Sequence, residues 1–115
     1  MLKTKVGYST LKDSYAKGKE AAKNANVGMR PKLGMMYCSC NDDVEEVVSG
    51  AISSMKGAPV IGCTSSGMIM TNDGIIESED GFAGLMSFDD KNMNIGVAAH
   101  KAGKNAREIG RKVAR

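Results

Sequence analysis

Residues 33–63 read LGMMYCSCNDDVEEVVSGAISSMKGAPVIGC. The apolar run at 33–38 predicts a buried strand, and the run at 60–63 predicts a second one. Between the two runs, apolar residues recur at helical spacing from Val44 to Met55. A strand, a helix and another strand in this succession are typical of an α/β unit with a parallel sheet.

The helix between the two strands has the clearest pattern in the chain. Acidic residues crowd its start at 42–46, where the positive end of a helix dipole favours negative charge. Gly57 and Pro59 then stop it, because glycine favours a helix end and proline cannot continue one. The apolar stripe consists of Val44, Val47, Val48, Ala51, Ile52 and Met55.

The rest of the chain predicts one α/β domain that covers residues 1–115. Its sheet is mixed: the first three strands are parallel, an antiparallel hairpin and further strands follow, and three helices pack around them. Small residues of the first helix face the sheet, with its lysines opposite. The Asn72-Asp73-Gly74 turn marks the hairpin. Beyond 33–63, the predicted elements are strands at 5–8, 81–88 and 93–99, helices at 11–25 and 102–115, and the hairpin at 68–77.

Composition excludes several classes of protein. The net charge of +3 is too small to indicate a nucleic-acid partner. No apolar run approaches the ~20 residues that a membrane helix needs, and the N-terminus lacks the apolar region of a signal peptide. An odd number of cysteines, three, suits a compartment where thiols stay reduced. We therefore expect a cytoplasmic protein without a membrane or nucleic-acid partner.

Small and polar side chains follow each of the first three predicted strands, and they form the candidate site. Parallel strands would bring these three endings to one edge of the sheet, where ligands of open α/β sheets bind. Hydroxyls and free backbone N–H groups there would suit a small polar ligand. The same residue types also make ordinary caps and turns, so both interpretations stay open. The candidate ligand-binding residues are Tyr8, Ser9, Thr10, Cys38, Ser39, Cys40, Asn41, Gly62, Cys63, Thr64, Ser65, Ser66 and Gly67.

Four segments resemble the FIST N-terminal domain family of F-box and intracellular signal transduction proteins. They are GYST at 7–10, YCSCND at 37–42, GCTSSG at 62–67 and GFAGLMSF at 81–88. The resemblance implies an intracellular sensory domain that binds a small ligand such as an amino acid, without catalysis or a cofactor. It also implies that the chain is equivalent to the N-terminal piece of a longer sensor. The partners that it implies are a small-molecule ligand and a FIST C-terminal domain or a signalling partner. With the C-terminal part absent, another subunit of a homo-oligomer would complete the pocket.

Three alternatives are open on the sequence alone. Cys63 is a candidate nucleophile for a thiol enzyme, with the single histidine, His100, as its base. Cys38, Cys40, Cys63 and His100 together have the atom types of a zinc site, although the Cys-x-x-Cys spacing is missing. The basic residues at 101–115 could contact nucleic acid, but no aromatic residues are interleaved with them.

Overall fold

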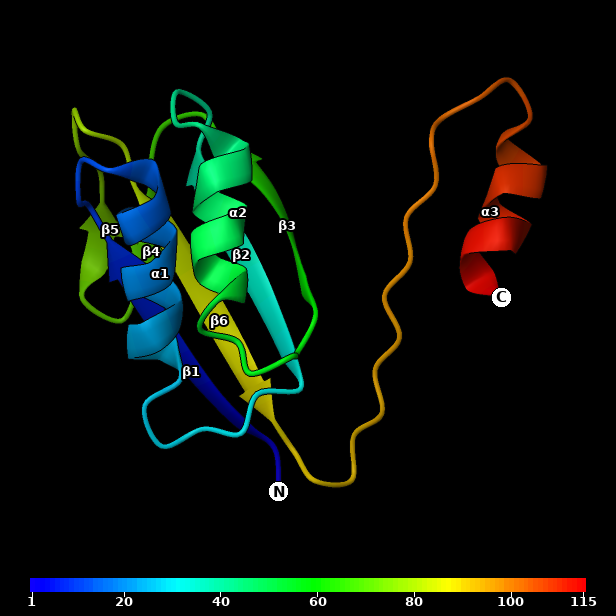
Figure 1. Cartoon of the computed structure of the whole chain (residues 1–115), viewed down its shortest axis with the longest axis horizontal. Coiled ribbons are helices and arrows are strands. Elements are labelled where there is room, and N and C mark those ends of the chain that lie inside the picture. Colours follow the sequence, from blue (N-terminus) through cyan, green and yellow to red (C-terminus); the bar gives the residue numbers. More distant parts are fainter.

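The computed structural model describes all of residues 1–115 and shows a four-stranded sheet with two helices packed on one face (Figure 1). The strand order is β1–β6–β2–β3. These strands span Lys3–Ser9, Ala83–Asp89, Leu33–Ser39 and Val60–Ser65 respectively.

The predicted mixed α/β class is confirmed, but the prediction of three parallel strands is wrong. Only β2 and β3 pair in parallel. Strand β6 lies between β1 and β2 and is antiparallel to both. The local pattern of each segment shows where strands form, but it does not show which later strand inserts between earlier ones. Because β6 opposes both neighbours, β1 still points in the same direction as β2.

Helices α1 (Ser14–Ala25) and α2 (Val44–Ile52) form the second layer. Helix α1 begins after Asp13, whose side chain accepts a hydrogen bond from the Ala16 N–H at 2.9 Å, and not at residue 11 as predicted. Helix α2 ends before the predicted stop, and turns follow it as far as residue 57. The two helices can approach closely because Gly18 has no side chain. A Cβ atom at this position would collide with the carbonyl of Val47.

The core lies between this helical layer and the sheet. It is built from small and flexible side chains, as the scarcity of aromatic residues requires. Its members are Ala21, Ala22, Ala25, Met36, Cys38, Val47, Ala51, Met55, Ala83 and Leu85. The predicted small-residue face of α1 is confirmed by this core, but Lys17 is fully buried on the same helix, so the prediction that the lysines all face away is wrong.

The predicted hairpin is confirmed as β4 (Ile69–Thr71) and β5 (Gly74–Ile76), which pair in an antiparallel fashion. Gly74 has a φ of 101°, which only glycine adopts without strain. Ile69 reaches Gly84 of β6. The hairpin therefore covers part of the sheet face opposite the helices.

The last part of the chain, residues 93–115, differs most from the prediction. Residues 93–99 form no strand, although their pattern predicts one. Helix α3 (Ala106–Ala114) does form, and it stands apart from the sheet with no buried residue (Figure 1). None of the helices combines the length and the apolar character that crossing a bilayer requires.

Candidate functional site

The three strand endings that the sequence singled out lie at one edge of the sheet. Ser9 of β1 pairs with Ala83 of β6, and Ala83 pairs with Cys38 of β2. Cys38 pairs in turn with Thr64 of β3. One row across the sheet therefore carries residues from all three endings, even though β6 separates the first ending from the other two.

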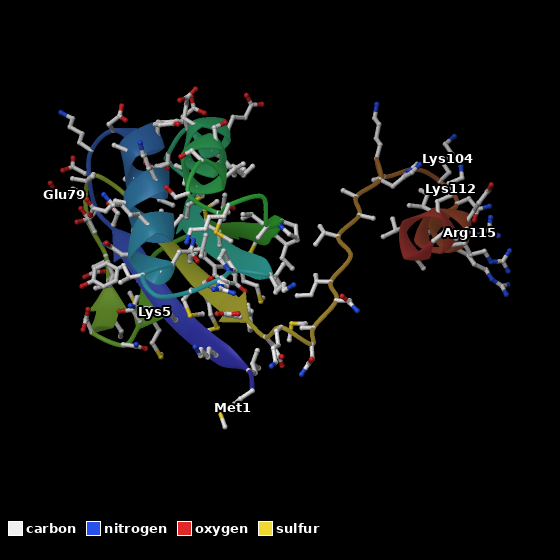
Figure 2. All side chains as sticks on the ribbon, turned by 60° about the horizontal axis from the view of Figure 1, so that its bottom comes forward. Met1, Lys5, Glu79, Lys104, Lys112 and Arg115 are labelled. Atoms are coloured by element: carbon white, nitrogen blue, oxygen red, sulfur yellow. The ribbon has the colours of Figure 1, made fainter.

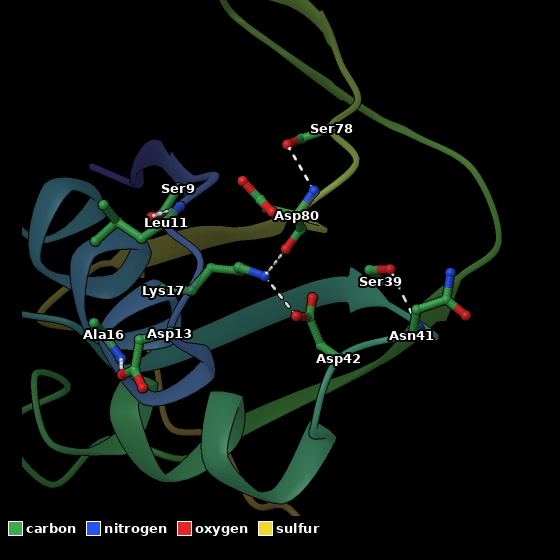
Figure 3. A network of polar contacts seen from close by, with 10 residues as sticks. All are labelled: Ser9, Leu11, Asp13, Ala16, Lys17, Ser39, Asn41, Asp42, Ser78 and Asp80. Carbon is green, nitrogen blue, oxygen red and sulfur yellow. Dashed lines mark hydrogen bonds and ion pairs between the residues drawn. The ribbon is translucent and has the colours of Figure 1, made fainter.

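Three of the predicted hydroxyls are used within their own turns. Ser9 Oγ accepts from the Leu11 N–H at 3.2 Å, and Ser39 Oγ accepts from the Asn41 N–H at 3.2 Å (Figure 3). Ser65 Oγ donates to a carbonyl three residues ahead at 2.9 Å. These bonds are typical of serine turns, which hold the chain as it leaves a strand. The ordinary turn interpretation is therefore the better one for these three residues.

Four of the predicted residues line one groove of about 470 Å³ between β3 and α2. Its walls are mostly apolar, with two thiols and one hydroxyl among them. The predicted residues that line it are Cys38, Gly62, Cys63 and Thr64. The other lining residues are Met36, Val44, Val48, Val60, Ile61 and, from the tail, Val97, Ala98 and Ala99. The remaining nine predicted residues lie outside it: Tyr8, Ser9, Thr10, Ser39, Cys40, Asn41, Ser65, Ser66 and Gly67.

Tyr8 makes a contact of a different kind. Its hydroxyl donates to Asp73 Oδ2 at 2.9 Å, which links β1 to the turn of the hairpin. This hydrogen bond, and then the negative charge of Asp73, raise the pKa of Tyr8. The side chain therefore holds the hairpin in place and does not reach the groove.

Sequence reasoning missed a buried ion pair at the same edge. Lys17 Nζ lies 2.5 Å from Asp42 Oδ1 and 2.5 Å from the Asp80 carbonyl oxygen (Figure 3). The Lys17 side chain is fully buried, and the second carboxylate oxygen of Asp42 is buried without a partner. The one signal in the sequence that indicated its burial was helical spacing. Lys17 precedes the core residues Ala21 and Ala25 by four and eight positions, so all three lie on one face of α1. The pair joins α1, the start of α2 and the loop before β6.

The cysteines differ in environment, although all three are free. Cys38 is buried, and this burial raises its pKa; the charge of Asp42 adds to the effect and that of Lys17 opposes it. Cys40 and Cys63 are exposed. A buried thiol with a raised pKa is a poor nucleophile at neutral pH, because the thiolate is the reactive form.

Neither chemical alternative gains support from the geometry. The His100 ring contacts the neighbouring Lys101 carbonyl at 2.8 Å, and no hydrogen bond joins it to Cys63. No three His, Cys, Asp or Glu side chains anywhere in the chain are placed to hold a metal ion. Both alternatives therefore stay predictions without a supporting contact.

The fold and the groove define an α/β domain with an open edge at β3. The FIST N domain family model matches residues 32–115. This chain therefore belongs to the FIST N domain family. The match includes GCTSSG at 62–67, whose first three residues line the groove, whereas GYST at 7–10 lies before it.

The empty FtsZ dimer of M. jannaschii is a similar solved structure, with a TM-score of 0.41 and 13% sequence identity. The alignment covers 87% of this chain, which spans 34% of the length of that chain. A likeness at this level carries no argument about fold or function. The comparison with curated proteins found no match.

Proposed function

We propose that this chain is a cytoplasmic sensory domain that binds a small polar metabolite, such as an amino acid, in signal transduction. Membership of the FIST N domain family supports a signalling role. The observation that carries the proposal is the groove, where residues from two predicted strand endings meet. Its volume of about 470 Å³ falls within the range of small-molecule sites, roughly 300–1,000 Å³.

The lining of the groove suggests how such a ligand would be held. Val44 and Val48 of α2 offer an apolar wall for an aliphatic side chain. Thr64 is exposed and offers a hydroxyl at the end of β3, beside the backbone that continues to Gly67. An amino acid with an aliphatic side chain would use both walls. The ligand would act by stabilising one conformation of the domain and not by bond making.

A panel of free amino acids tests the proposal by thermal shift. A ligand that binds the folded state raises the melting temperature of the wild type, and the rise grows with the logarithm of the ligand concentration once the site is mostly occupied. Thr64→Val should abolish this rise while leaving the unliganded melting temperature within a few degrees. Thr10→Val is the matched control, because Thr10 is exposed and lies outside the groove. The proposal is wrong for amino acids if none of them raises the melting temperature, or if Thr64→Val responds like the control.

A further inference from the structure

Helix α2 and strand β3 leave an apolar surface open along one side of the domain. On α2, Val44 is 36% exposed and Ile52 is 54% exposed, with the half-buried Val48 between them. These three residues lie four positions apart and form one stripe along the helix. Strand β3 pairs only with β2, so the backbone along its other edge has no partner.

The exposed edge of β3 has none of the features that protect natural edge strands. Residues 60–65 contain no charge and no proline, and Ile61 to Thr64 are exposed. Lysines, prolines or bulges usually prevent such an edge from pairing with other chains. An unprotected edge next to an apolar stripe indicates a surface that another segment covers.

The tail at 93–115 has the complementary features. Helix α3 places Ala106, Ile109 and Val113 on one side, yet none of its nine residues is buried. A helix shorter than ~12 residues is marginal in water unless it packs against something. Upstream of it, the apolar segment at 95–99 forms no strand, although it already lines the groove beside β3 through Val97, Ala98 and Ala99.

The charges of the two surfaces also match. The acidic residue Glu45, in the first turn of α2, lies beside the apolar stripe at helical spacing. On α3, Arg107 and Lys112 fall on either side of the apolar stripe at helical spacing. Figure 2 shows basic side chains, Lys112 and Arg115 among them, around the separate α3. Basic flanks on α3 would therefore meet an acidic neighbour if the two stripes packed together.

We propose that residues 93–115 dock onto their own domain, with 95–99 pairing along the free edge of β3 and α3 packing on the α2 stripe. The tail follows β6, which ends level with the start of β3, so 95–99 would run parallel to β3. Docking goes beyond the proposed function because it needs no ligand. It would also cover Val44 and Val48, which form the apolar wall of the groove, so α3 and a bound ligand would exclude each other there.

Hydrogen–deuterium exchange on the full chain tests the docking without a ligand. In the wild type, we expect amides of α3, and those of β3 that are not bonded to β2, to exchange at least about tenfold more slowly than unstructured peptides. Ile109→Gln with Val113→Gln should remove the protection of both segments. Glu108→Gln with Arg111→Gln is the matched control on the opposite side of α3 and should keep it.

A variant in the apolar stripe of α2 distinguishes loss of docking from unfolding of α3 itself. Ile52→Gln leaves α3 itself unchanged, so a loss of protection in both α3 and β3 supports contact between the stripes. Fast exchange of α3 and of the β3 edge in the wild type would overturn the proposal. So would protection that Ile52→Gln leaves intact. Protection that rises with protein concentration, together with a dimer in analytical ultracentrifugation, would also overturn it, because the tail would then sit on a second copy.

Discussion

The buried pair between Lys17 and Asp42 gives the sharpest stability prediction. Asp42→Asn removes the negative charge with little change in shape and leaves a fully buried ammonium beside a neutral amide. Breaking a buried pair from one side costs about 3–5 kcal/mol, a large part of the roughly 5–15 kcal/mol that stabilises a typical domain. Urea unfolding followed by circular dichroism measures this loss, since the chain contains no tryptophan.

Asp43→Asn is the control, because it makes the same chemical change at the next residue. Asp43 is exposed and caps α2 through a 3.3 Å bond from the Glu46 N–H, and asparagine caps about as well as aspartate. We expect a loss below about 0.5 kcal/mol for this variant. In a double-mutant cycle with Lys17→Met, the double variant should lose less than the sum of the single losses. The reasoning is refuted if Asp42→Asn costs no more than the control, or if the cycle is additive within about 0.5 kcal/mol.

Three further predictions concern separate parts of the domain. The hydrogen bond to Asp73 raises the pKa of Tyr8, so the stability from this link is complete below the ordinary tyrosine pKa of about 10 and is lost as pH rises through the raised pKa. Absorbance at alkaline pH should show the Tyr8 titration at lower pH in Asp73→Asn; an unchanged titration would contradict the contact. Burial raises the pKa of Cys38, so iodoacetamide should label the two exposed thiols first and Cys38 only on unfolding, which mass spectrometry detects; equal labelling of all three native thiols would be the contrary result. Gly18→Ala should destabilise the domain by about 1–3 kcal/mol in urea unfolding, because the new methyl group meets the Val47 carbonyl; a gain in stability would show that the helices can move apart.

Local patterns predicted most of the elements but not their arrangement. Helix α2 and the hairpin around Gly74 depend on spacing and turn chemistry within a few residues, and both form, although α2 ends at Ile52, before its predicted stop. The place of β6 between β1 and β2 depends on long-range pairing, which spacing along the chain does not encode. The segment at 93–99 has strand-like composition, but a strand forms only when another strand pairs with it.

Local patterns also indicated some of the residues that line the groove, but not how the elements around it are arranged. The sequence indicates which residues follow each strand, and Thr64 and its neighbours do line a groove. The serines at Ser9 and Ser39 bond within their turns, which composition does not distinguish from ligand contacts. Val44, which forms the apolar wall, appeared only as part of a helix stripe, because its role depends on how α2 sits against β3. Lys17 was missed because a lysine in an amphipathic helix normally faces water.

Titrating ¹⁵N-labelled protein with individual amino acids and following the backbone amide resonances would decide most directly whether the groove binds a ligand. The account predicts saturable shifts that cluster at Cys38 and along 62–67, and that disappear in Thr64→Val. Spectra that stay unchanged at millimolar ligand, or shifts that cluster away from β3 and α2, would contradict it.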